Sequence, residues 1–138
     1  MSDDTSMTIK RLNPPELGTP PGYSQIVDVQ AGRIIFIAGQ TALDRNGILV
    51  GKDSFPAQAE QVFCNLEIAL QSVGCTAANL VKLTVFVRDM SNLAAYRAAR
   101  NRFFATVAPP AAPAITLVEV SKLYGPEFLI EIEAIAAT

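Results

Sequence analysis

Two segments near the C-terminus decide the fold: PAITLVEV at residues 113–120 and LIEIEAIA at residues 129–136. Both show the alternation that is typical of a β-strand with one buried face. In the second segment Glu131 and Glu133 point away from Ile130 and Ile132, so both carboxylates lie on the same face. We therefore expect two closing strands, Ile115–Val120 and Phe128–Ala136.

Strand-like segments also precede these two. Residues 24–30 alternate between polar and apolar side chains, which predicts a half-buried strand. Ile34–Gly39 is a continuous apolar run, which predicts a strand that is buried on both faces. Leu80–Val87 is a further strand, and Met7–Leu12 is a possible strand at the sheet edge. Asp44–Gly47 contains Asn-Gly and predicts a turn.

Two helices are predicted from apolar residues at three- and four-residue spacing. The first begins near Pro56 with Asp53 or Ser54 as its cap, and Gly74 ends it. Ser91 is the predicted cap of the second. The apolar stripe of the second helix comprises Leu93, Tyr96, Ala99, Phe103 and Val107.

Each helix has a single apolar face, so both should cover one side of a mixed sheet in a two-layer α+β domain. The predicted strands are apolar on both sides, and no helix remains for the second face. Another copy of the chain is the simplest cover, as half of the 138 residues are hydrophobic. We expect a tail and possible edge strand at residues 1–12 and a single domain at residues 13–138.

Composition argues against several classes of function. The net charge is −2, and no basic stripe is present, so nucleic acid is not an expected partner. No apolar run reaches the ~18 residues that cross a membrane.

The polar, acidic residues Met1–Met7 favour a cytoplasmic protein over a secreted one. The chain has no histidine, which excludes the usual zinc sites and histidine-based triads. Cys64 and Cys75 are expected to be ordinary small apolar side chains.

Taken together, these segments resemble the RidA family of enamine/imine deaminases, also known as the YjgF or endoribonuclease L-PSP family. The resemblance extends over about residues 21–136. It implies a chorismate-mutase-like fold with a six-stranded mixed sheet, and a homotrimer with three small-molecule clefts at its subunit interfaces. The segments that match, besides the two C-terminal strands, are Gly22–Gln25, Gly39-Gln40, Gln58–Gly74, Thr84–Asp89 and Phe103-Phe104.

The resemblance also implies a reaction: hydrolysis of short-lived imines to ammonia and a 2-oxo acid, without a metal or an organic cofactor. Glu131 matches the glutamate that handles the proton and the attacking water, and Tyr23 matches a tyrosine of the ligand cleft. Gly39 and Gln40 match a pair whose amides can line the cleft, although an architectural role fits them equally.

Three positions depart from the family pattern, and each has become alkyl. Ile115 stands where the deaminases carry the arginine that clamps the substrate carboxylate. Ala38 replaces a serine, and Leu117 replaces a cysteine. A hydrogen bond to a charged group contributes roughly 1.5–3 kcal/mol, so loss of a two-bond clamp would cost about two to four powers of ten in substrate capture.

Two arginines on the second predicted helix offer a replacement charge. Arg97 and Arg100 stand where relatives more often carry asparagine and tyrosine. Either residue could supply a relocated cation, and the simpler interpretation is that both are solvated.

Three hypotheses for the function remain open. The first is a divergent enamine/imine deaminase-like hydrolase that acts on a substrate without the usual small carboxylate, using Glu131 and water. The alternative is a non-catalytic trimer that binds a ligand or another protein. A ribonuclease is the third, and the acidic charge counts against it. Whether Glu131 faces a closed cleft or bulk water separates the first two.

Overall fold

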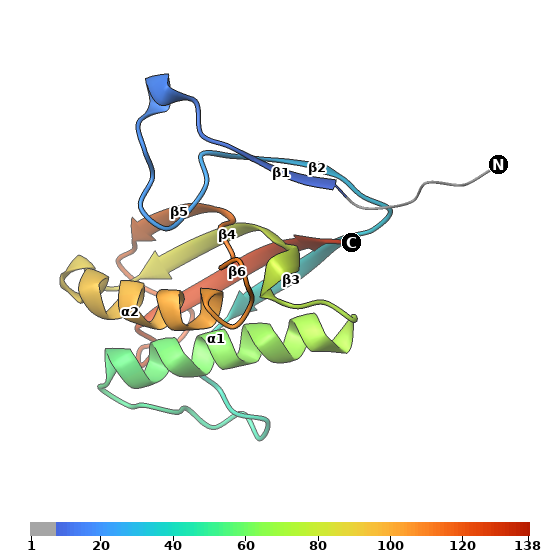
Figure 1. Cartoon of the computed structure of the whole chain (residues 1–138). Helices are drawn as coiled ribbons and strands as arrows, with labels where there is room; N and C mark the ends of the chain where they lie inside the picture. The colour runs from blue at the N-terminus through green and yellow to red at the C-terminus, as the bar shows by residue number, and fades with distance from the viewer. Residues whose placement is uncertain (1–7) are drawn as a thin grey trace.

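Two helices cover one face of a four-stranded sheet, and a two-stranded ribbon lies on the side of the sheet away from the helices (Figure 1). The computed structural model describes residues 8–138, so the tail predicted at Met1–Met7 lies outside the described residues. The strands are β1 (Thr8–Leu12), β2 (Ile26–Gln30), β3 (Ile34–Gln40), β4 (Leu80–Val87), β5 (Ala114–Glu119) and β6 (Ile130–Ala137). The helices are α1 (Phe55–Ser72) and α2 (Leu93–Phe104), with short 3-10 turns at Pro15–Leu17, Ala77–Asn79 and Met90–Asn92.

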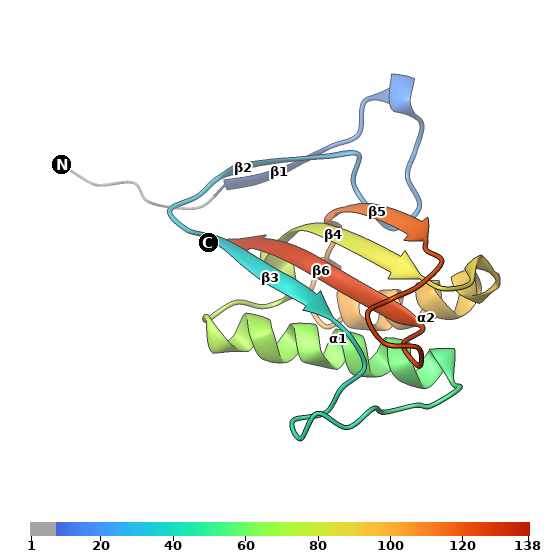
Figure 2. The same ribbon diagram turned by 180° about the vertical axis from the view of Figure 1, so that it is seen from behind.

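The sheet is mixed, as predicted, and its strand order is β3-β6-β4-β5 (Figure 2). β6 is antiparallel to both of its neighbours, while β4 and β5 are parallel. The six expected strands do not form one continuous sheet, because β1 and β2 pair only with each other as a ribbon. Ser24 ties the chain before this ribbon to the sheet: its N–H donates to the Pro113 carbonyl at 3.1 Å and its hydroxyl donates to the Ala112 carbonyl at 2.5 Å.

The two helices begin differently from one another. α1 follows the sequence prediction, since the Ser54 hydroxyl accepts a hydrogen bond from the Ala57 N–H at 3.3 Å. For α2 the prediction that Ser91 is the cap is wrong. The Asp89 carboxylate accepts from the Ser91 N–H at 2.9 Å and starts the 3-10 turn that leads into the helix. Val107, predicted in the helical stripe, lies beyond the end of α2.

The two faces of the sheet differ sharply in burial. The core face, defined by Leu83 and Val85 of β4 with Ile130 and Ile132 of β6, packs under α1 and α2, and all four side chains are 0% exposed. The opposite face, called the open face, has no helix on it.

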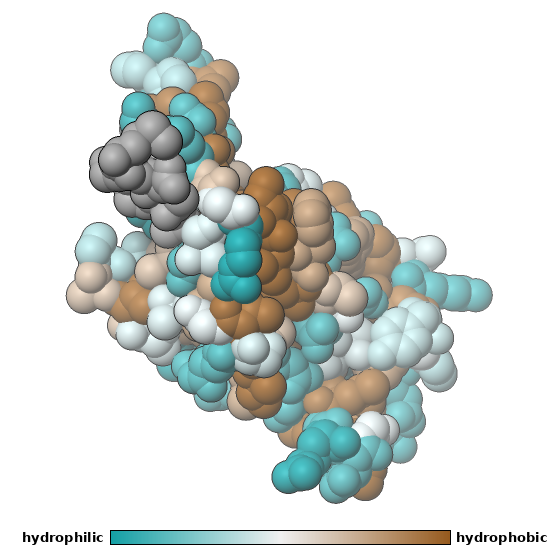
Figure 3. Space-filling view, turned by 90° about the vertical axis from the view of Figure 1, so that its right-hand side faces the viewer, coloured by the Kyte–Doolittle hydropathy of each residue, from teal (hydrophilic) through white to brown (hydrophobic). Residues whose placement is uncertain are grey.

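The open face carries the side chains of β3 that were expected to be buried. Ile34 is 62% exposed and Phe36 is 76% exposed, so burial of β3 on both faces is wrong for the single chain. The physical reason is that both helices pack on the same side. Figure 3 views the side of the molecule where β3 and the C-terminus lie, and it shows hydrophobic side chains gathered there.

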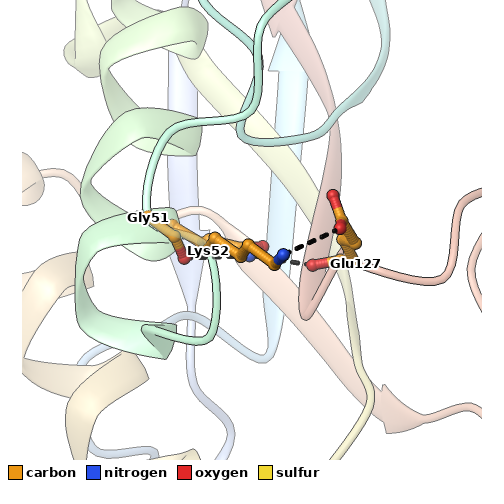
Figure 4. Close-up of polar contacts among 4 residues, drawn as sticks. Gly51, Lys52 and Glu127 are labelled. Carbon is orange, nitrogen blue, oxygen red and sulfur yellow. Dashed lines mark hydrogen bonds and ion pairs between the residues drawn. The ribbon is translucent and has the colours of Figure 1, made fainter.

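A buried glutamine fixes the entry into β6. Gln58 of α1 is 0% exposed, and its amide nitrogen donates to the carbonyls of Gly51 at 3.2 Å and Glu127 at 2.9 Å. Its amide oxygen accepts from the Leu129 N–H at 2.9 Å. An exposed ion pair between Lys52 and Glu127, at 3.6 Å, joins the same two loops (Figure 4). These contacts therefore fix the position of the chain directly before β6, the strand that carries Glu131.

Candidate functional site

The residues predicted to form one cleft separate into two groups on opposite faces of the sheet. Ile115 and Leu117 of β5 pair with Leu83 and Val85, which lie on the core face. Glu131 pairs with Phe86, whose side chain points to the open face. A single chain therefore does not bring the position of the missing clamp together with the glutamate.

The first group surrounds a cavity of about 200 Å³ between α2 and β5, which we call the α2–β5 cavity. Tyr23 reaches it because the neighbouring Ser24 is bridged to Ala114, at the start of β5. The predicted ligand residues Tyr23, Arg97, Ile115 and Leu117 line this cavity, together with Leu93, Tyr96 and Arg100.

Arg100 lies in the wall of this cavity and is 7% exposed, so the expectation that it is solvated is wrong. Its Nε and Nη2 atoms both donate to the Asn101 amide oxygen at 3.1 Å. The guanidinium carbon lies 5.8 Å from the centre of the Tyr96 ring and 6.0 Å from that of Phe104, within cation–π range. Arg97, by contrast, is exposed.

The burial of Arg100 had a signal in the sequence. The residue follows Tyr96 by four positions, so it lies on the same helical face as the apolar stripe. A stripe defined by apolar residues alone leaves this arginine out.

The second group lies where β3 ends beside β6. Gly39 packs directly against Glu131, and a β-carbon at residue 39 would overlap the carboxylate. Glu131 is half-buried. Burial raises its pKa above the ordinary value, and the negative charge of Glu133 raises it further. A raised pKa suits a carboxyl group that must both hold and release a proton.

The other residues of the second group line two hollows. Ala38 lies beside Phe36 and Glu133 in a hollow of about 340 Å³. Gly39 and Gln40 line a larger one of about 620 Å³, and the Gln40 amide donates to the Ala38 carbonyl at 3.0 Å.

The sequence analysis missed one polar pair in the larger hollow. The hydroxyl groups of Thr41 and Tyr124 are hydrogen-bonded at 2.6 Å and contribute to its wall. The two residues lie in loops far apart in the chain. No pattern within either loop connects them.

Within residues 8–138 no three His, Cys, Asp or Glu side chains come together as a metal site. No helix in this part of the chain is long and apolar enough to span a membrane. Cys75 is buried in the core, whereas Cys64 is exposed on α1, so only Cys75 packs as a core side chain.

The sequence matches known proteins along nearly its whole length. Residues 16–138 match the family model described as endoribonuclease L-PSP. The chain belongs to this family. The relationship to the RidA/YjgF group inferred from the C-terminal strands is thus confirmed.

Curated relatives of this RidA-family chain include proteins of two names. A RutC family protein of Synechocystis is 37% identical over 132 residues, which cover 94% of this chain and 97% of that protein. The 2-iminobutanoate/2-iminopropanoate deaminase of Salmonella typhimurium is 36% identical over 131 residues, which cover 95% and 97%. Some members of the family are therefore named as deaminases.

Solved structures of family members share the fold. A Rid-family protein of unknown function from Yersinia pestis has a TM-score of 0.83 at 36% identity, covering 94% of this chain and 98% of that one. The YjgF gene product of Escherichia coli has a TM-score of 0.69 at 32% identity, covering 91% and 92%. The predicted α+β fold, with two helices on a mixed sheet, is confirmed.

Proposed function

We propose that this RidA-family chain forms a small-molecule-binding homotrimer and acts as a divergent enamine/imine deaminase-like hydrolase. Its substrate does not present the usual small carboxylate to residue 115, where the alkyl side chain of Ile115 replaces the arginine of the deaminases. The observation that carries the proposal is Glu131: a half-buried carboxyl group with a raised pKa, held against Gly39 on the open face.

In the proposed reaction Glu131 acts on the water that attacks the imine carbon. The carboxylate accepts a proton from the water as the new C–O bond forms, and passes that proton to the imine nitrogen. The same carboxylate then carries the hydroxyl proton of the carbinolamine to its nitrogen as the C–N bond breaks, which releases ammonia and leaves a ketone. The sum is imine plus water giving ketone plus ammonia, which requires no redox partner.

The position of the two groups supports assembly. Glu131 and Ile115 lie on opposite faces of one sheet, so a cleft that uses both must combine two copies of the chain. The exposed side chains of Ile34 and Phe36 on the open face favour such contact, because large apolar groups are costly to leave in water. A closed ring of three copies would cover every open face in the same way.

A non-catalytic trimer that binds a ligand or a protein is the second candidate. It is favoured by the alkyl side chains of Ala38, Ile115 and Leu117, which stand where the deaminases carry side chains that act on the substrate. A ribonuclease, the activity in the family model's description, is less well supported, because a chain with a net charge of −2 attracts RNA weakly.

Release of ammonia from imines generated in solution separates the two main candidates. We expect the protein to accelerate release over buffer, and Glu131→Gln to lower the rate by about 10²–10⁴-fold, as for loss of a general acid–base group. Glu133→Gln is the matched control, since it removes the neighbouring carboxylate of the same strand face. Its rate should stay within a few-fold of wild type.

The substrate panel should include imines with and without a carboxylate. If the wild-type protein accelerates none of them while it still binds their ketone products, the non-catalytic candidate stands. Equal losses in Glu131→Gln and Glu133→Gln would point to general electrostatics rather than to proton transfer by one residue.

A further inference from the structure

Arg100 places a positive charge in the interior without a carboxylate to balance it. No acidic side chain within residues 8–138 lies within ion-pair distance of its guanidinium group. The hydrogen-bond partners it does have are neutral: the Asn101 amide oxygen and, at 3.5 Å, the Pro21 carbonyl. Burial of an unbalanced cation is costly, so the arrangement is incomplete without an anion.

Donors remain available at the α2–β5 cavity. The Nη1 atom of Arg100 makes no hydrogen bond to the described part of the chain. The Tyr96 hydroxyl is buried, and it too has no partner within residues 8–138. Burial raises the pKa of Tyr96 to about 12, although the nearby Arg100 charge acts in the opposite direction. The hydroxyl therefore keeps its proton at neutral pH and can donate it in a hydrogen bond.

We infer that the α2–β5 cavity binds the carboxylate of a small ligand through Arg100, with the Tyr96 hydroxyl as a second donor. Arg97, which is exposed, adds positive charge at the mouth of the cavity. The alkyl side chains of Ile115 and Leu117 form the facing wall. The ligand class is thus a carboxylate with an alkyl body, and a 2-oxo acid is the simplest example.

The geometry leaves a defined donor for a carboxylate oxygen. Arg100 is held between the Tyr96 and Phe104 rings, and Asn101 binds one edge of its guanidinium, so the direction of the remaining donors is set. Nη2 is already bonded to Asn101 and Pro21, so Nη1 is the donor left for a carboxylate oxygen, in a charge-assisted hydrogen bond. Both arginines also border an adjoining cavity of about 400 Å³ beside Pro21 and Gly22, which leaves room for a longer ligand.

This inference rests on the proposed ligand cleft and not on its catalysis. The contact with the substrate's negative charge then lies on α2, at Arg100, rather than on β5, where Ile115 stands. A substrate that does not present its carboxylate to residue 115 is therefore still able to carry one.

Calorimetric titration with 2-oxobutanoate and with its neutral amide, 2-oxobutanamide, tests the inference on the intact protein. We expect wild type to prefer the carboxylate by about ten- to a hundredfold, the effect of a hydrogen bond to a charged group. Arg100→Met should remove most of that preference while keeping the length of the side chain. Arg97→Met should reduce the preference for the carboxylate only a few-fold, since the Arg97 charge is solvated.

Arg102→Met is the matched control on the same helix. Arg102 is exposed and pairs with Glu60 at 3.4 Å, away from the α2–β5 cavity, so its loss should leave the preference unchanged. Equal affinity of wild type for the acid and the amide would by itself overturn the inference, whatever the variants show. So would an Arg100→Met protein that folds and keeps the full preference. Failure of the proposed hydrolysis shows separately, as absence of ammonia release with the carboxylate preference intact.

Discussion

The core face and the open face of the sheet are built from the same strands and serve different purposes. On the core face, leucine, valine and isoleucine lie fully buried under two helices. On the open face, Phe36 and Ile34 are exposed beside Glu131 and Glu133. The core face holds the chain together, whereas the open face combines apolar contact surface with titratable groups. The strand β6, which alternates between the two faces, therefore contributes to both stability and the candidate site.

The largest expected effect comes from placing a charge on the open face. Phe36→Glu puts a carboxylate where the proposed trimer buries an aromatic ring, and burying an unpaired charge costs several kcal/mol. We expect light scattering to show a change from trimer to monomer, with helix content by circular dichroism unchanged. Ala98→Glu, which adds the same charge to an exposed position of α2, should leave the trimer intact.

A monomeric wild-type protein would contradict this account of the open face. So would a Phe36→Glu trimer of undiminished stability, since the exposed ring would then lie outside every interface.

The next largest effect is a difference in stability between truncations of two isoleucines of β6 that point to opposite faces. Ile132 is 0% exposed on the core face, so Ile132→Ala should lower the free energy of unfolding by about 2–5 kcal/mol. Ile135 is half-buried on the open face, so Ile135→Ala in the monomeric Phe36→Glu background should cost less than about half as much. Denaturant unfolding measures both. Equal losses in that background would mean that the open face belongs to the chain's own core.

Much of the fold was accessible from the sequence because its signals are local. The alternation of Glu131 and Glu133 with isoleucines placed both carboxylates on one face, and Ser54 capped α1 as expected. The start of α2 was misplaced because Asp89 and Ser91 are both good capping residues. Only the geometry of the turn selects between them.

The candidate site was less accessible because it depends on long-range placement. Tyr23 and Ile115 meet only because Ser24 is bonded to the chain before β5. The separation of Ile115 from Glu131 by the sheet depends on strand register, which no single segment encodes. Helical spacing indicates that Arg100 is buried, but whether a carboxylate of residues 8–138 balances its charge depends on segments far away in the chain.

The smallest expected effect is a pH dependence of stability that comes from the open face alone. Burial, and secondarily Glu133, raise the pKa of Glu131 above 4.5, so the folded chain holds this proton more tightly than the unfolded chain. The resulting stabilisation is fully present below the unfolded pKa and is lost as the pH rises through the folded pKa. Glu131→Gln lacks the titration. Wild type should therefore lose stability relative to the variant as the pH rises above 4.5.

Unfolding free energies of wild type and Glu131→Gln, compared across this pH range at one protein concentration, measure the difference. It should stay below about 1 kcal/mol, because the half-exposed carboxyl is screened by solvent. Glu133→Gln should reduce the difference without abolishing it, since burial is the larger cause. A difference of opposite sign would mean that a positive charge, such as one from another copy of the chain, stabilises the Glu131 carboxylate. The open face would then supply a paired carboxylate rather than a proton carrier.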